Sequence, residues 1–123
     1  MLRLLTILLI LTGCAAPRPP VSDADARRFA AALDARTAHI VAGTATYTAT
    51  SQVEMLRGRL YVRTVIRGDS KDRIGSAVNQ IFHEARQVGK DLGVACETNG
   101  AFEPAVVSWN GRQIECRMLT VGF

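Results

Sequence analysis

Residues 44–66 read TATYTATSQVEMLRGRLYVRTVI, and this stretch decides the fold. Its β-branched residues and its alternation of apolar and polar positions are typical of half-buried strands. Arg57 and Gly58 predict a turn between two such strands, although Arg is an unusual first residue of a tight primed turn and a glycine bulge is the alternative. A two-residue loop gathers the apolar side chains on one face of the hairpin. The pairs it predicts are Met55–Leu60, Val53–Val62, Ser51–Thr64 and Ala49–Ile66.

A helix is predicted before this hairpin, over residues 22–41. Ser22 is a suitable N-cap, and Asp25 stands where a capping box places its acid. Gly43 is the expected end of the helix. The apolar face, at helical spacing, consists of Phe29, Leu33 and Ile40, with Ala32 and Thr37 between them.

A second helix is predicted after the hairpin, over residues 71–92, with its cap within residues 68–70. Gly93 is a natural stop, because glycine tolerates the left-handed conformation at helix ends. The continuous apolar stripe is the clearest helical signal in the chain. It comprises Ile74, Val78, Ile81, Phe82, Ala85, Val88 and Leu92.

Three further strands are predicted at the C-terminal end of the chain. Residues 94–98 read as a short strand, and Asn110-Gly111 reads as the tight turn of a hairpin between residues 105–109 and 112–119. This turn pairs Trp109 with Arg112, Val107 with Ile114 and Ala105 with Cys116, so Cys116 points inward and Trp109 packs in the hairpin or the core.

The predicted order of elements is α-β-β-α-β-β-β. Strands joined by hairpins form antiparallel sheets, and two amphipathic helices need an apolar surface to cover. We therefore expect an α+β fold, a two-layer sandwich in which an antiparallel sheet of about five strands packs against two helices.

The N-terminal residues have the pattern of a secretory signal. Arg3 supplies a positive charge, the residues from Leu4 to Leu11 are apolar except for Thr6, and small residues follow. The apolar run is shorter than the roughly 18 to 20 residues that a membrane-spanning helix needs. We expect export without a transmembrane segment.

The residues Leu11, Thr12, Gly13 and Cys14 resemble the lipobox of the bacterial lipoprotein family. The resemblance implies that the signal is cut before Cys14, that the Cys14 thiol carries a thioether lipid and that its new amino group is acylated. Several acyl chains hold a protein durably on a membrane, at about 0.8 kcal/mol per buried methylene. In that family a residue other than Asp after the Cys usually permits export to the outer membrane, so the resemblance implies, through Ala15, the periplasmic side of the outer membrane rather than the inner membrane. An ordinary secretory signal with an accidental Cys is the alternative.

The lipobox divides the chain into three parts. Removing residues 1–13 leaves 123 − 13 = 110 residues, of which 14–21 form the lipidated Cys and a Pro-rich tether with Pro17, Pro19 and Pro20. Residues 22–123 form a single small domain with a marginal core.

With Cys14 attached to lipid, Cys96 and Cys116 remain in a compartment that oxidises thiols. We expect a disulfide between them, which would stabilise the fold by roughly 3 kcal/mol for a loop of about 20 residues. Two separate buried thiols are the alternative.

Neither catalysis nor a metal site is indicated. His39 and His83 lie one on each predicted helix, and His83 lacks the second His that a zinc protease helix carries four positions later. No Ser stands in a Gly-x-Ser-x-Gly turn, and no glycine-rich phosphate loop is present. We expect a protein that is not an enzyme and that carries no cofactor besides the lipid on Cys14.

One predicted strand face is basic. Arg59, Tyr61, Arg63, Val65 and Arg67 alternate with Leu60, Val62, Thr64 and Ile66, so the two sets project from opposite faces. Guanidinium groups suit phosphate and carboxylate recognition, which makes Arg59, Tyr61, Arg63 and Arg67 candidate ligand-binding residues. A solvated face whose charges deter edge pairing is the alternative.

The charge also bears on the class of partner. The full chain has a net charge of +4, and loss of Arg3 leaves 4 − 1 = +3. An exported basic protein meets anionic lipid headgroups and lipopolysaccharide rather than nucleic acid. The expected function is that of a non-enzymatic envelope lipoprotein that interacts with another envelope protein. The alternatives are a module that binds anionic envelope ligands and an inhibitor of a periplasmic hydrolase.

Overall fold

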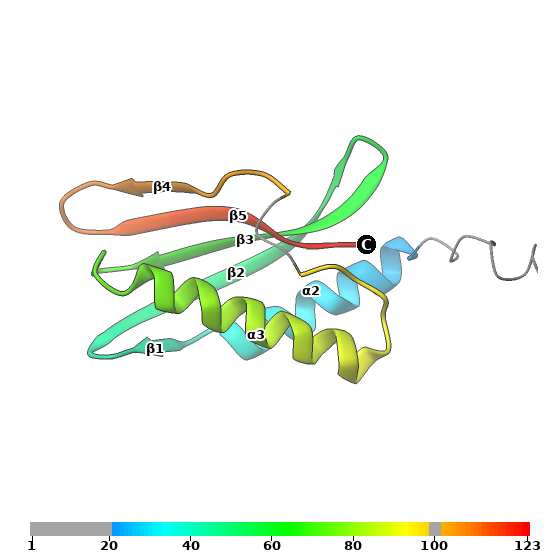
Figure 1. The fold of residues 1–123 in the computed structure, drawn as a ribbon, viewed down its shortest axis with the longest axis horizontal. Coiled ribbons are helices and arrows are strands. Elements are labelled where there is room, and N and C mark those ends of the chain that lie inside the picture. The colour runs from blue at the N-terminus through cyan, green and yellow to red at the C-terminus, as the bar shows by residue number, and fades with distance from the viewer. Residues whose placement is uncertain (1–20, 99–101) are drawn as a thin grey trace, which may run out of the picture.

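The computed structural model describes residues 21–98 and 102–123, which form two helices and a five-stranded sheet (Figure 1). All neighbouring strands are antiparallel, and their order across the sheet is β1-β2-β3-β5-β4. The predicted α+β fold is confirmed. The elements are α2 (Asp23–Thr37), β1 (Ile40–Ala42), β2 (Ala45–Leu56), β3 (Arg59–Gly68), α3 (Ile74–Leu92), β4 (Val106–Trp109) and β5 (Ile114–Gly122).

The central hairpin of β2 and β3 has the predicted register. All four expected pairs are present, from Met55↔Leu60 to Ala49↔Ile66. Arg57 and Gly58 form the two-residue loop with φ angles of 52° and 78°. Positive φ at both positions is the mark of a primed turn, whose twist matches that of the strands, so the bulge alternative is wrong.

Both helices cover one face of the sheet. Along β3, Val62, Thr64 and Ile66 are buried, whereas the residues between them are not. We call the other side of the sheet the open face. Figure 1 shows α2 and α3 near β1 and β2, with β4 at the edge farthest from the helices.

A row of three buried hydroxyls divides the core. Thr120 donates to Thr64 Oγ1 at 2.7 Å, and Ser51 Oγ lies 3.1 Å from the same oxygen, so the row crosses β5, β3 and β2. On one side lies a cluster that includes Tyr47, Ile66 and Ile81, and on the other side lies a cluster that includes Phe29, Val88 and Val121. Because each hydroxyl has a hydrogen-bond partner, the row is buried without an unsatisfied group.

The first helix is shorter than predicted. It begins at the Ser22 cap, whose Oγ accepts from the Asp25 amide at 3.1 Å, but it ends at Thr37. Residues 40–42 form β1 instead of a last helical turn, and Gly43, at φ +63°, belongs to the turn into β2. A glycine with positive φ serves a helix end and a tight turn equally well, so its presence did not distinguish the two structures.

The second helix is also shorter than predicted, because it begins at Ile74 rather than at residue 71. Ser70 is not its N-cap. Its hydroxyl accepts from the Asp72 amide, and its carbonyl accepts from the Tyr47 hydroxyl at 2.6 Å, so it stabilises the loop before the helix. The helix ends as predicted, with Gly93 left-handed at φ 64°.

The C-terminal strands differ from the prediction in two places. Residues 94–98 are not a strand, because they make one isolated bridge, Glu97↔Gly122. The last hairpin has a four-residue loop, since the Asn110 side chain accepts from the amides of residues 112 and 113 and holds the loop open. The pairs are therefore Trp109↔Ile114 and Val107↔Cys116. The order of elements becomes α-β-β-β-α-β-β.

Candidate functional site

The predicted basic stripe lies on the open face of the sheet. Arg59, Tyr61, Arg63, Val65 and Arg67 come from β3, opposite the buried residues that face the helices. The stripe is not a row of free cations, because each of its three arginines contacts at least one carboxylate.

Arg63 is held by two glutamates. Its Nε and Nη2 contact the two carboxylate oxygens of Glu54, which lies on β2, and its Nη1 donates to Glu103 at 2.8 Å. The hydrogen bonds to Glu54 and then to Glu103 raise the pKa of Arg63 above its usual range. Three of the Arg63 donors therefore already have acceptors. Since Glu103 lies in the chain after α3, these hydrogen bonds hold that segment against the central hairpin.

Arg67 shares its carboxylate partner, Glu115, with Arg117, a residue that the sequence prediction missed. Arg67 Nε lies 3.2 Å from one oxygen of Glu115, and Arg117 Nε lies 2.6 Å from the other. The hydrogen bond from Arg117 is the larger cause, and that from Arg67 a smaller one, of a lowered pKa at Glu115. Two guanidinium groups on one carboxylate leave one positive charge in excess at this position.

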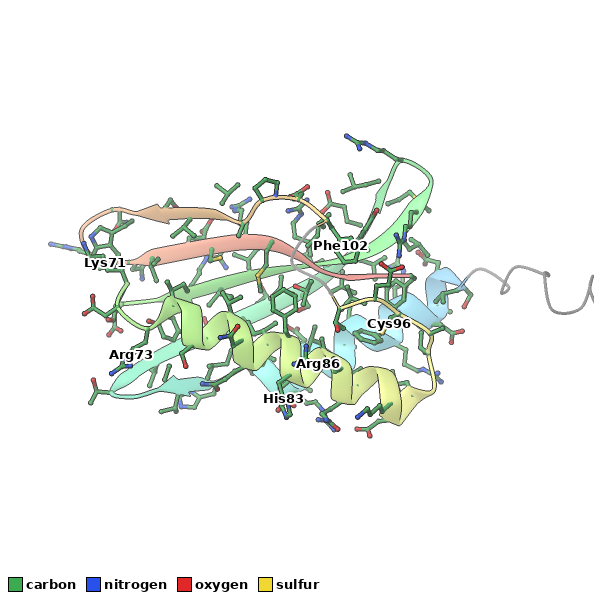
Figure 2. All side chains as sticks on the ribbon, viewed as in Figure 1. Lys71, Arg73, His83, Arg86, Cys96 and Phe102 are labelled. Atoms are coloured by element: carbon green, nitrogen blue, oxygen red, sulfur yellow. The ribbon has the colours of Figure 1, made fainter. Side chains whose placement is uncertain are left out.

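Arg59 and Tyr61 form an aromatic cluster with Phe102, which lies over the sheet near β3 and β5 (Figure 2). The Arg59 guanidinium carbon is 5.4 Å from the centroid of Tyr61 and 5.5 Å from that of Phe102. Its Nε donates to the carbonyl oxygen of Phe123 at 2.8 Å, and its Nη2 lies 3.4 Å from Glu97. These contacts fix the C-terminal end of β5, so Arg59 and Tyr61 have a structural role.

A hollow of about 430 Å³ lies on the open face between β2, β3 and β5. Its guanidinium groups belong to Arg63, Arg67 and Arg117, and its carboxylate belongs to Glu54. Planar guanidinium groups can bind a phosphate or a carboxylate in two-point fashion. The remaining lining residues are Thr50, Gln52, Val53 and Val65.

The sequence prediction did not identify a second surface, the outer edge of β4. Val106, Val107 and Trp109 are exposed by 61%, 53% and 39%. Trp109 is therefore not a core residue, and its ring lies 5.8 Å from the Lys71 ammonium. The signal was the lack of any charged residue in the segment 105–109, since charges usually protect edge strands.

The two histidines lie on separate surfaces. His39 is exposed in the segment between α2 and β1, and His83 is exposed on α3, where it projects away from the sheet (Figure 2). Within residues 21–98 and 102–123, no group of three His, Cys, Asp or Glu side chains could hold a metal ion. No helix in the same residues has the length and apolar character to cross a bilayer.

The predicted lipid-attachment residue, Cys14, lies outside the described residues, as do residues 1–13 and the tether through residue 20. The other two cysteines are free thiols, and the predicted disulfide between Cys96 and Cys116 is not formed. Cys116 is buried, Cys96 is half-buried, and burial raises the pKa of each thiol.

Geometry explains why the two sulfurs do not meet. Cys96 precedes Glu97, which pairs with Gly122 at the far end of β5. Positions 116 and 122 of an extended strand are about 20 Å apart, and a disulfide needs Cα atoms within about 7 Å. The two thiols therefore belong to different halves of the core: Cys116 to the cluster of Tyr47 and Cys96 to that of Phe29.

A scan against protein-family models and searches of the curated proteins and of the solved structures find no match to this chain.

Proposed function

We propose that the protein is a small, non-enzymatic lipoprotein of the bacterial cell envelope, anchored through lipid on Cys14 and acting as an interaction module. The observation that carries the proposal is the lipobox-like sequence Leu11, Thr12, Gly13, Cys14 before a Pro-rich tether. The exposed edge of β4 supports an interaction role, because an uncharged strand edge offers backbone groups to a partner.

Lipidation is tested by metabolic labelling with an alkyne analogue of palmitate in Gram-negative cells that express the full chain. We expect label on the wild-type protein and recovery in the membrane fraction. Cys14→Ala should lose the label and move to the soluble fraction, because the lipid on Cys14 is the only membrane anchor in the proposal. Cys96→Ala is the matched control, since it removes a thiol and leaves the lipobox intact. A labelled or membrane-bound Cys14→Ala variant would contradict the proposal.

The interaction role is tested by cross-linking in the same cells followed by purification of the tagged protein. We expect a reproducible envelope protein in the cross-linked material. Recovery of nothing specific from cells in which the protein is correctly anchored would speak against an interaction module while leaving the lipid anchor in place.

Binding of anionic envelope ligands is a second candidate function. The observation that favours it is the excess positive charge where Arg67 and Arg117 share Glu115, at the hollow on the open face. A phosphate group of lipopolysaccharide or of a phospholipid headgroup would accept hydrogen bonds from these guanidinium groups and balance the excess charge.

Vesicles of anionic phospholipid, and separately lipopolysaccharide, test this candidate. Binding should weaken with added salt and in the double Ala variant of Arg67 and Arg117, the two residues that share Glu115. The control is the double Ala variant of Arg27 and Arg86, which are exposed on the helices and have the same total charge. Equal loss in both variants would indicate nonspecific attraction, and unchanged binding in the first would exclude this site.

A further inference from the structure

The strand β4 is an edge without protection. Its four residues, Val106–Trp109, are all exposed, and three of the five large apolar side chains exposed in the described residues belong to it. The strand contains no Lys, Arg, Asp, Glu or Pro, the residues that usually deter pairing with another chain. In a protein that stays monomeric, such an edge invites aggregation.

The opposite edge of the sheet is protected. β1 has only three residues, and it pairs with β2 only as far as Tyr47. Beyond that point α2 protects the edge of β2, because the Ser51 amide donates to Oδ1 of Asp34, on α2, at 3.1 Å. The contrast between the two edges indicates that β4 is left open for pairing.

The backbone of β4 shows which groups are available. The Asn110 amide donates to the carbonyl oxygen of Gln113 at 3.2 Å, so it points toward β5. Amides of successive residues alternate in direction along an antiparallel strand. The amides of Ser108 and Val106 therefore point toward β5, whereas the N–H and C=O groups of Val107 and Trp109 point outward from the sheet.

We propose that the β4 edge pairs with β4 of a second copy of this chain, antiparallel and about a two-fold axis at Ser108. In this register Val107 of each copy forms hydrogen bonds opposite Trp109 of the other, and the outward backbone groups of both strands are satisfied. An aromatic side chain opposite a β-branched one is a favourable cross-strand pair. The two five-stranded sheets become one continuous sheet with all helices on the same side.

Self-complementarity is the argument for a second copy. A two-fold interface places the same patch against itself, so any charge near the axis would meet its own kind. The four residues of β4 carry no charge, and the Val107 and Trp109 side chains of the two copies cover one another in this register. A strongly acidic or basic partner strand would find no opposite charge on β4 to meet. The pairing does not depend on lipid at Cys14.

The register can be tested by cross-linking the full chain in intact cells with a mild oxidant. Ser108 faces Ser108 of the second copy in a non-hydrogen-bonded pair, where Cα atoms are about 4.5 Å apart, within the range of a disulfide. Ser108→Cys should therefore give a disulfide-linked homodimer. Val106→Cys is the matched control, exposed on the same side of the strand, because Val106 of the second copy lies about 13 Å away along the strand.

We expect a dimer of twice the chain mass for Ser108→Cys, background levels for Val106→Cys and wild type, and loss of the dimer when Val107→Lys is added to Ser108→Cys. Equal cross-linking at positions 106 and 108 would overturn the register. Absence of dimer for Ser108→Cys, together with a monomeric mass for the wild-type protein at all concentrations, would overturn the self-pairing. Adducts of Ser108→Cys with a different protein would also overturn it, since the edge would then serve another partner.

Discussion

Replacing Gly68 with Ala should destabilise the fold by filling space that Tyr47 already occupies. Gly68 pairs with Tyr47 across β2 and β3. A Cβ atom at Gly68 would lie 2.3 Å from Cδ1 and 2.6 Å from Cε1 of the Tyr47 ring, and 3.0 Å from the Thr46 carbonyl oxygen. The backbone angle at Gly68 lies outside the left-handed region, so the destabilisation comes from lack of space and not from backbone strain.

The size of the effect follows from these distances. Carbon atoms in contact are normally about 3.5 to 4.0 Å apart, so the ring must move by more than about 1 Å. Tyr47 is only 1% exposed, and its hydroxyl is bonded to the Ser70 carbonyl oxygen. Overpacking costs about 1 to 3 kcal/mol, loss of the hydrogen bond adds about 1 kcal/mol, and the reduced entropy of the unfolded chain offsets about 0.4 to 1 kcal/mol. We expect a net loss of about 1 to 3.5 kcal/mol, or about 5 to 25 °C in Tm.

Urea unfolding followed by circular dichroism measures this loss. Gly75→Ala is the control, because no atom lies within 4 Å of its added Cβ, and Ala should favour the helix by up to about 1 kcal/mol. In a Tyr47→Leu background the ring is gone, so adding Gly68→Ala should cost much less than it does in the wild type. The same cost in both backgrounds, or a cost below about 0.5 kcal/mol in the wild type, would refute the steric reasoning.

Three other predictions concern the turn, the open face and the thiols. Arg57 adopts φ 52°, which costs a side chain about 1 to 2 kcal/mol, so Arg57→Asn should raise the free energy of unfolding by a part of that amount; a decrease would contradict the turn assignment. Arg117→Ala should raise the pKa of Glu115 in a carboxyl NMR titration, because the largest cause of its lowering is removed. The stabilisation from the lowered pKa of Glu115 is present above the ordinary Glu pKa and is lost as the pH falls through the folded-state value, and an unchanged Glu115 titration in the variant would refute this pairing. Thiol titration without reductant should find Cys96 and Cys116 both free after unfolding, with Cys96 reacting faster than Cys116 in the folded chain, whereas the absence of free thiols would contradict the structure.

The elements that the sequence predicted well are those whose pattern is long and repeats itself. The register of β2 and β3 followed from one turn, Arg57-Gly58, because the period of two then places every apolar residue on one face. The stripe of α3 extends over most of its 19 residues, so its identity did not depend on its first turn. Both features are local and are dominated by hydrophobic burial.

The features that were missed depend on contacts distant in the chain or on side chains that bond to the backbone. β1 exists because Ile40 can pair with Tyr47 after a turn, which the helical spacing of Ile40 did not indicate. Residues 94–98 lack a neighbouring strand along most of their length, and this decides against the disulfide. The Asn110 side chain lengthens the last loop by accepting hydrogen bonds from two backbone amides. A dipeptide pattern such as Asn-Gly does not indicate side-chain bonds of this kind.

The candidate site shows the same division. The alternation along β3 correctly placed Arg59, Arg63 and Arg67 on one face. Their carboxylate partners come from β2, from β5 and from the segment between α3 and β4, so the pairing of the stripe with carboxylates could not be predicted without the strand order. Binding by the stripe and lipidation of Cys14 both stay predictions.

The hydroxyl row in the core has a consequence for how this protein can evolve. Because Ser51, Thr64 and Thr120 separate two apolar clusters, a volume change in one cluster does not have to be compensated in the other. Each half can therefore drift through its own series of substitutions. The three hydroxyls should be inherited together, since replacing the central Thr64 alone leaves both Ser51 and Thr120 without their partner in the row, and relatives of this chain should retain or exchange them as a set.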